Sequence, residues 1–373
     1  MDNLQWDAYV ISHPLSTLYH LYGWKNVVEK TYGHKTYFLS AIEHHTVDDK
    51  NNGNETSKFR VCGILPLVHI KSFLFGNNLV SMPYCDMGGV LADNEEIEEA
   101  LISEAMGIAK KIKADSIELR HTRPISKLNT KKTGQPQTLG FTHSANPRHQ
   151  AWHTTKSDKV RMLLDLPESS EILMKSFKSK LRSQIKRPLK EGLKSKVGGL
   201  ELLDHFYEVF LVNMRDLGSP VHSKQMMRQV LEQFPESAKI VIVYKGRKPI
   251  ACSLIIGFKD TLENPWASAL RTYSRLSPNM LLYWAMLEYA CDNGFRHFDF
   301  GRSTPGEGTW RFKKQWGAEP NPLDWQYIFL KGQPEIAETS GKAKFEKAIQ
   351  YWQKIPLPIA RTLGPMIRKY IGL

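Results

Sequence analysis

The sequence predicts an α/β (α+β) fold of two consecutive units, each a mixed, mostly antiparallel sheet flanked by helices. Its 373 residues suffice for two domains of ordinary size. In each half, a β-hairpin and a further strand precede a long helix, which leads into a strand that ends in a cation. These strand ends are Leu119-Arg120-His121 and Phe300-Gly301-Arg302. The halves share the order of their elements but few residues.

The composition favours polyanionic partners and gives no sign of a metal site. The formal net charge is +13, a surplus that suits RNA, nucleotide-linked sugars or anionic membrane surfaces. The cysteines lack the close pairs typical of zinc sites and redox dithiols. They are Cys62, Cys85, Cys252 and Cys291. We therefore expect reduced core thiols and no metal.

The start of the sequence and its hydropathy predict a cytoplasmic protein. The first residues, Met-Asp-Asn-Leu-Gln-Trp-Asp, have neither the positive start nor the apolar run of a signal peptide. No stretch reaches the roughly 18 consecutive apolar residues of a membrane helix.

Residues 1–155 form the first predicted unit. Aromatic-rich helical segments occupy residues 1–30, and the polar segment 48–57 predicts a loose hairpin tip. Residues 95–113 carry apolar side chains at helical spacing. Residues 124–150 are rich in Gly, Pro, Asn and His, which indicates an irregular segment before the boundary. The β-like runs are 37–41, 59–70, 79–82 and 116–120.

Residues 156–332 form the second predicted unit. Residues 240–258 predict a hairpin around a Lys-Gly-Arg-Lys turn. Ser277 followed by Pro278 is a typical helix start, a capping residue and then a proline in the first turn. The predicted helix runs to Asn293 and leads directly into the next strand.

A basic helix lies near the beginning of the second unit. Phe177, Leu181 and Ile185 recur every four residues as one apolar stripe, and Pro188 should end or kink the helix. Lysines and arginines cover its other faces. The candidate RNA contacts among them are Lys180, Arg182 and Lys186. The alternative, an amphipathic helix with a solvated basic face, is slightly favoured.

The stretch 295–317 is the densest candidate site. Phe298 and Phe300 alternate as in a buried strand, and a glycine-rich loop follows. Cations next to aromatic residues come after the loop, a combination that suits an anionic ligand. The loop lacks the Gly-Lys-Ser/Thr ending of a P-loop, which argues against a nucleoside triphosphatase. An ordinary strand, surface loop and solvated basic segment would show the same residue types.

Residues 333–373 predict a basic, amphipathic helical tail. Leu363, Ile367 and Tyr370 give it an apolar side, and Arg361 and Arg368 accompany them. Such a piece can rest on the inner face of a membrane. Docking on the protein's own body is the favoured interpretation.

Several of these motifs together resemble the FemAB-like branch of the GNAT acyltransferase superfamily. They are the run 273–282, Phe298-Asp299-Phe300-Gly301-Arg302 and Gly308-Thr309-Trp310-Arg311-Phe312-Lys313. The runs 22–25 and 64–72 are most similar to the FemAB-related protein associated with PEP-CTERM and exopolysaccharide systems. The resemblance spans most of the chain and implies two tandem GNAT-like units. It also implies transfer of an acyl or aminoacyl group to an amine on a cell-envelope, peptidoglycan or exopolysaccharide precursor.

The resemblance implies roles for individual residues. In Fem-type enzymes the Phe-Lys pair after Gly-Thr lies at the active site, and here that pair is Phe312-Lys313. Acyl transfer places negative charge on a carbonyl oxygen, which makes Lys313 the candidate for charge stabilisation. Asp299 could orient the amine or take its proton, and a structural role at the strand end is equally open. The candidate substrate contacts are Lys25, Arg271, Tyr273, Arg302, Arg311 and Phe312.

The expected acyl donor is aminoacyl-tRNA or acyl-coenzyme A, and no cofactor is expected to bind tightly. Enzymes that use acyl-coenzyme A usually grip its pyrophosphate with a glycine-containing turn, whereas the turn 275–279 has no glycine. Fem-type sequences continue a helix with alanine where Pro188 stands. The expected partners are tRNA and a nucleotide- or lipid-linked envelope precursor, not DNA. The alternatives are an acetyl-coenzyme A-dependent N-acetyltransferase and a non-catalytic RNA- or polysaccharide-binding protein.

Overall fold

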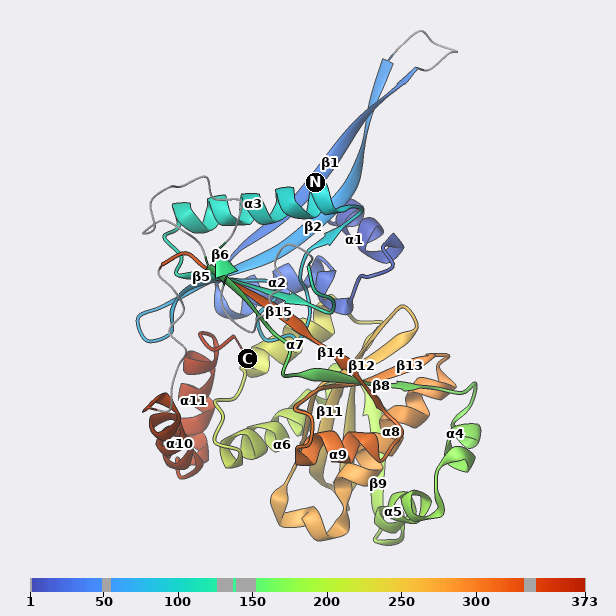
Figure 1. Ribbon diagram of the computed structural model, residues 1–373. Coiled ribbons are helices and arrows are strands. Elements are labelled where there is room, and N and C mark those ends of the chain that lie inside the picture. The colour runs from blue at the N-terminus through green and yellow to red at the C-terminus, as the bar shows by residue number, and fades with distance from the viewer. Residues whose placement is uncertain (1, 49–54, 126–136, 139–151, 332–339, 373) are drawn as a thin grey trace.

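The computed structural model shows two sheets, each flanked by helices (Figure 1). It describes residues 2–48, 55–125, 137–138, 152–331 and 340–372. One hydrophobic core cluster joins the two halves, because it includes Trp24 and Val68 as well as Phe206 and Leu282. The halves therefore pack on each other.

The first unit consists of the first sheet and the helices around it. Its strands are β1 (Lys35–Asp48), β2 (Glu55–Ser72), β3 (Gly76–Val80), β4 (Leu91–Ala92), β5 (Ser116–His121), β6 (Gln137–Thr138), β7 (Trp152–Lys156) and β15 (Asp324–Phe329). Their order is β1-β2-β3-β5-β15-β7-β6, with β4 paired to β2. The helical segments are α1 (Asn3–Ser12), η1 (Leu18–His20), α2 (Gly23–Tyr32) and α3 (Glu95–Lys111).

The second unit is built on a sheet in the order β14-β8-β13-β12-β11-β10-β9. Its strands are β8 (Val160–Asp165), β9 (Leu193–Gly198), β10 (Ala238–Lys245), β11 (Lys248–Phe258), β12 (Thr261–Ala269), β13 (His297–Ser303) and β14 (Glu319–Pro322). Its helical segments are α4 (Ser170–Ser176), α5 (Ser179–Lys190), η4 (Leu200–Leu202), α6 (Leu203–Asp216), α7 (Lys224–Gln233), η5 (Arg271–Leu276), α8 (Pro278–Asp292) and α9 (Gly308–Lys314).

Strand β15 connects the two units more closely than the sequence division suggests. The predicted second unit, 156–332, includes this strand, but β15 lies in the first sheet between β5 and β7. A strand's sequence position does not decide which sheet it joins, because ladder pairing depends on long-range contacts. The first sheet is therefore completed by a late segment of the chain.

Two local predictions need correction or qualification. Pro188 does not end its helix, because α5 continues to Lys190. The predicted hairpin tip 48–57 is partly strand, since β1 and β2 pair out to Asp48 and Glu55, and its remaining residues lie outside the described ones. Most of the predicted irregular region, 124–150, also lies outside them, because 126–136 and 139–151 are not among the described residues.

The tail docks on the body of the protein, as the sequence favoured, through α11 (Leu357–Arg368), which follows α10 (Ser340–Gln353). Gly364 packs against Val221 so closely that a Cβ atom there would lie 2.9 Å from a methyl carbon. Arg368 Nε donates a hydrogen bond to His222 Nε2 at 3.0 Å. None of the helices in the described ranges is long and apolar enough to cross a bilayer.

Candidate functional site

The candidate site begins where two parallel strands of the second sheet separate. β12 and β13 pair only from Thr261 to Glu263 and from His297 to Asp299. Beyond that point Gly301 adopts a left-handed conformation, with φ at +74°, and the pairing of β13 with β8 shifts register. The strands diverge and leave room between them.

Asp299 holds this bend in place. Its two carboxylate oxygens accept hydrogen bonds from the Gly301 N–H and from Arg161 Nε, each at 2.8 Å. The side chain is fully buried. Because both oxygens are engaged, this geometry favours the structural role of Asp299 over the role of proton acceptor.

A cavity of about 510 Å³ opens beside the diverging strands. The end of β12, the segment η5, the start of α8 and one side of α9 form its walls. The residues that line it include Ser268, Leu270, Arg271, Ser277, Asn279, Tyr283, Thr309, Phe312 and Lys313. Three residues predicted for the site, Arg271, Phe312 and Lys313, therefore line the same cavity.

Lys313 is a buried cation on the wall of this cavity. Its exposed fraction is only 7%, and its Nζ donates hydrogen bonds to the carbonyl oxygens of Gly301 at 3.0 Å and Arg302 at 2.9 Å. Burial lowers the pKa of Lys313 to about 8, against the opposing charges of Asp299 and Asp86. An ammonium has three N–H donors, so one remains for a ligand.

Aromatic rings fix the position of the helix that carries Lys313. Phe312 meets the ring of Tyr283 edge-on, with centroids 4.9 Å apart, and Tyr283 stacks on Phe300 at 5.5 Å. Trp316 lies 6.2 Å from Phe312. Such contacts lock α9 against α8 and β13, so Lys313 is preorganised.

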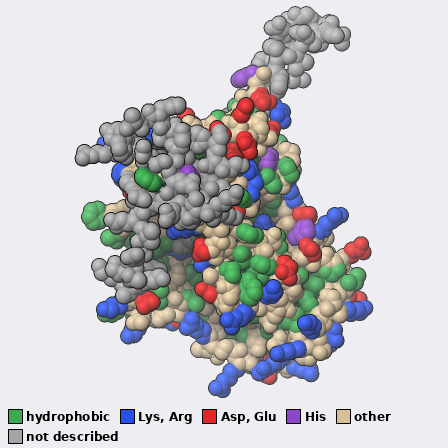
Figure 2. Space-filling view, in the orientation of Figure 1, with side chains coloured by type: hydrophobic (Ala, Val, Ile, Leu, Met, Phe, Trp, Pro, Cys, Tyr) green, Lys and Arg blue, Asp and Glu red, His purple; other side chains and the backbone are tan. Residues whose placement is uncertain are grey.

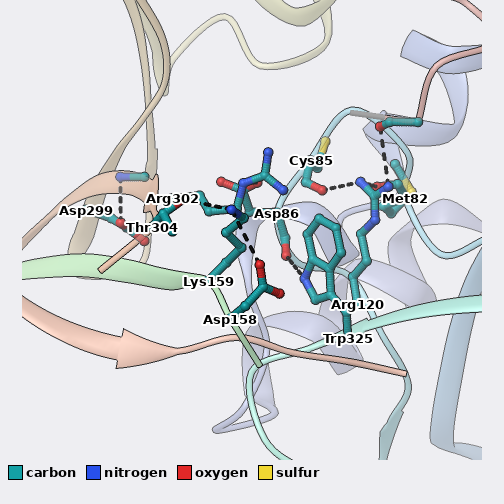
Figure 3. Close-up of polar contacts among 12 residues, drawn as sticks. Met82, Cys85, Asp86, Arg120, Asp158, Lys159, Asp299, Arg302, Thr304 and Trp325 are labelled. Atoms are coloured by element: carbon teal, nitrogen blue, oxygen red, sulfur yellow. Dashed lines mark hydrogen bonds and ion pairs between the residues drawn. The ribbon is translucent and has the colours of Figure 1, made fainter. Parts of the chain in front are cut away.

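Arg302 lies at the boundary between the two units (Figure 3). Its guanidinium stacks on the indole of Trp325 at 5.1 Å, and Arg120 stacks on the same indole at 4.6 Å. Arg302 Nε also lies 3.4 Å from an oxygen of Asp86 in the first unit. The cationic strand ends predicted in the two halves thus meet at one ring.

Lys159 adds a second cation to this boundary. Its Nζ donates to Thr304 Oγ1 at 2.7 Å and lies 3.4 Å from Asp158 (Figure 3). The side chain of Arg302 is 28% exposed and that of Lys159 is 35% exposed. Both cations can therefore be reached from solvent.

A buried acid accompanies Asp299 on the neighbouring strand. Glu263 lies opposite Asp299 in the strand register and accepts a hydrogen bond from the hydroxyl of Tyr19 in the first unit. Burial, and then the negative charge of Asp299, raise the pKa of Glu263 well above its usual value. Asp299 carries the ion pair with Arg161, and burial favours the protonated form of Glu263.

The other predicted substrate contacts lie at or outside the rim of the cavity. Arg311 is exposed on α9, and Tyr273 is half-buried on η5 with Lys248 Nζ 5.4 Å from its ring. Lys25 lies on α2 of the first unit, where it pairs with Glu29 at 3.1 Å. Neither Lys25 nor Arg311 lines the cavity.

The predicted RNA contacts differ from one another in their surroundings. Arg182 is half-buried, and its Nη1 donates to the carbonyl oxygens of Phe177 and Lys175. This contact joins α5 to the end of α4. Lys180 and Lys186 are exposed.

Sequence reasoning missed the residues that complete the site from other elements. These are Tyr19, Asp86, Lys159, Arg161, Glu263 and Trp325. They come from five separate segments, with Lys159 and Arg161 together around the start of β8, so no local motif contains them all. The period-two pattern of residues 324–329 predicts a strand, but it does not predict which sheet that strand joins.

The side chains show neither a cysteine nucleophile nor a metal cluster within the described ranges. The four thiols are buried, and burial raises the pKa of each. In the same ranges, no group of three or more His, Cys, Asp or Glu residues could hold a metal ion.

Comparison with known proteins supports the fold. Residues 175–314 match a family model described as an acetyltransferase (GNAT) domain. The crystal structure of FemX matches with a TM-score of 0.60 and 17% identity, over 87% of this chain and 96% of that one. A search of curated proteins finds no match. The predicted fold of two tandem GNAT-like units is thus confirmed, and residues 175–314 of the second unit are similar to an acetyltransferase (GNAT) domain.

Two further solved structures are similar at lower scores. The C-terminal domain of a putative lysylphosphatidylglycerol synthetase from Agrobacterium fabrum has a TM-score of 0.48 and 10% identity, over 82% of this chain and 87% of that one. L-PGS from Bacillus licheniformis has a TM-score of 0.48 and 11% identity, over 89% of this chain and 96% of that one.

Proposed function

We propose that this protein is an acyltransferase that moves an acyl or aminoacyl group to an amine on a cell-envelope, peptidoglycan or exopolysaccharide precursor. The observation that carries the proposal is the buried ammonium of Lys313 on the wall of a 510 Å³ cavity, at the point where β12 and β13 diverge. The GNAT domain match over residues 175–314 supports the same class of reaction.

In the proposed reaction the donor occupies this cavity with its carbonyl group near Lys313. The acceptor nitrogen attacks the carbonyl carbon, and the C–O bond of an ester or the C–S bond of a thioester breaks. The departing oxygen or sulfur takes up the proton that the nitrogen loses. Lys313 donates to the carbonyl oxygen as negative charge develops on it. No covalent enzyme intermediate is required, which agrees with the buried state of the four thiols.

The acceptor approaches from the boundary between the units. Arg302 and Lys159 are the accessible cations there, and Asp86 provides a carboxylate. A nucleotide- or lipid-linked precursor carries phosphate groups, which arginine and lysine bind well. An envelope precursor is the preferred acceptor because the motifs resemble those of Fem-type enzymes, and the similarity in fold to FemX supports that resemblance.

The preferred donor is aminoacyl-tRNA, and acyl-coenzyme A is the second candidate. The exposed Lys180 and Lys186 on α5 offer contacts for a polyanionic donor. For acyl-coenzyme A, the specific observation is that Ser277 and Asn279, at the start of the long helix α8, line the cavity. A helix start favours a phosphate.

The experiment is a transfer assay with two labelled donors. Purified protein is incubated with a pool of labelled aminoacyl-tRNA, or with labelled acetyl-coenzyme A, and with amine-bearing envelope precursors. Label on the precursor from charged tRNA supports the preferred donor, and label from coenzyme A supports the second.

Binding measurements accompany the assay. Affinities for charged and uncharged tRNA are compared over a salt series, because phosphate contacts weaken steeply with salt. Binding of tRNA without transfer from either donor would contradict the enzymatic proposal and favour a non-catalytic binding protein.

A further inference from the structure

The turn between β2 and β3 exposes three consecutive apolar side chains. Phe73, Leu74 and Phe75 are 103%, 80% and 43% exposed. In Figure 2 a group of hydrophobic side chains stands at the left edge of the molecule, where Figure 1 places this turn. Single exposed apolar residues are ordinary, but a cluster at a protruding tip indicates an interaction site.

The fold does not need apolar residues at this tip. Gly76 supplies the left-handed conformation of the turn, with φ at +83°. Polar groups fix the base, because Asn78 donates to the carbonyl oxygen of Phe75 and Asn77 donates to those of Ile112 and Lys113. Turns favour Gly, Asn, Asp and Ser, so three consecutive apolar residues are unusual at the tip of a turn.

Lysines surround the base of the tip. Lys71 and Lys113 are exposed beside it, and Lys110 and Lys111 lie in the last turn of α3. The acid at the base, Asp115, pairs with Lys331 at 2.5 Å. The tip is therefore an apolar projection with lysines around its base. We call these lysines, Lys71, Lys110, Lys111 and Lys113, the lysine collar.

The outer face of α11 is a second exposed apolar surface. Ile359, Leu363 and Met366 are 46%, 40% and 58% exposed and lie on one side of the helix. The opposite side is fixed to the body, because Gly364 packs on Val221. The helix therefore cannot turn its apolar face inward.

The tip and the end of α11 lie on the same side of the molecule. The carbonyl oxygen of Lys369 is 2.8 Å from His34 Nε2, directly before β1. The next residue, Lys35, pairs with His69, and β2 reaches Ser72 three residues later, about 10 Å along the strand. Figure 1 shows the turn and α11 on the same side.

We propose that the Phe73–Phe75 tip, together with the outer face of α11, docks on an anionic lipid membrane. The tip would enter the boundary between headgroups and acyl chains, while the lysine collar meets lipid phosphates. A protein partner would need a broad complementary surface of roughly 1,000 Å² or more, whereas this tip is a narrow projection. The inference goes beyond the proposed transfer reaction and does not depend on it.

The test is flotation of the full chain with vesicles of defined composition. We expect binding to phosphatidylglycerol-rich vesicles that weakens with salt, and little binding to pure phosphatidylcholine. The double variant Phe73→Ser/Leu74→Ser should bind at least about tenfold more weakly, because two large apolar side chains no longer partition. The matched control is Leu200→Ser, at a 43% exposed leucine in η4 of the second unit, and it should bind like the wild type.

Three outcomes would overturn the proposal. The first is that the wild type does not bind anionic vesicles, and the second is that the double variant binds them as well as the wild type does. The third is that the wild type forms a dimer without lipid and the double variant does not, which would assign the tip to a contact with a second copy of the chain. A dye that responds to polarity, attached at Leu74→Cys, gives an independent readout because the native cysteines are buried. Its emission should shift to the blue with anionic vesicles, and unchanged emission would contradict insertion.

Discussion

The two units contain equivalent parallel strand pairs whose surroundings differ. In the first unit β3 pairs with β5 over three residues, and in the second β12 pairs with β13 over three. In the first unit the segment after β3 fills the space beyond the pair: Ser81 and Gly88 both bond to β5, and the buried Arg120 donates to Cys85. In the second unit the corresponding space is a cavity with Lys313 on its wall.

The difference shows how one architecture serves two purposes. Arg120 is 1% exposed, and its guanidinium contacts Glu118, Met82, Cys85 and Gly372. Its charge therefore stabilises the fold. Arg302 stacks on the same Trp325 but remains partly exposed. We infer that the first unit supports the site and the second performs the chemistry.

The largest effect on stability is expected for Arg120→Met. The change removes the hydrogen bonds that Arg120 donates to the carbonyl oxygens of Met82, Cys85 and Gly372, and it breaks the ion pair with Glu118. We expect it to reduce the free energy of unfolding by about 3–5 kcal/mol. Denaturant unfolding measures it. A loss below about 1 kcal/mol would remove the contrast between the two arginines.

The largest effect on turnover is expected for Lys313→Met. Without the ammonium, kcat should fall about 10²- to 10³-fold, or about 3–4 kcal/mol of transition-state stabilisation. The free energy of unfolding should change by about 1 kcal/mol or less, because relief of a buried charge offsets two lost hydrogen bonds. The matched control is Lys314→Met, at an exposed neighbour, which should retain turnover.

A smaller effect is expected for Arg302→Met. The variant should raise the KM for the acceptor about tenfold, or about 1.4 kcal/mol, with kcat nearly unchanged. Steady-state kinetics with varied acceptor measure this. An increase in the KM of the donor instead would place the acceptor elsewhere.

The smallest effect is expected for Glu263→Gln. Because burial raises the pKa of Glu263 and favours its protonated form, an amide of the same shape should preserve the hydrogen bond from Tyr19 and keep transfer within about twofold. Transfer rates at neutral pH measure it. A hundredfold loss would instead identify Glu263 as a general base.

Local sequence patterns predicted the elements around the candidate site, because the strand at Phe298 and Phe300 and the helix start at Pro278 are both present in the structure. Lys313 was instead singled out by the resemblance to Fem-type enzymes, and the structure places it on the wall of a cavity. Trp325 and Asp86 could not be predicted, because only the placement of β15 in the first sheet and the docking of the units bring them to Arg302. The proposed membrane tip was missed because a three-residue turn has no periodicity.

The measurement that tests the central claim most directly is the pH dependence of single-turnover transfer at saturating acceptor, with non-enzymatic donor hydrolysis subtracted. The pKa of Lys313 is lowered to about 8, so its charged form is lost as the pH rises through that value. The acceptor amine titrates in the same range and affects both proteins alike, so the informative quantity is the ratio of the wild-type rate to the Lys313→Met rate. We expect this ratio to fall as the pH rises through about 8, because the charged form of Lys313 is lost there. A ratio that stays constant from about pH 7 to about pH 10 would contradict the role of Lys313.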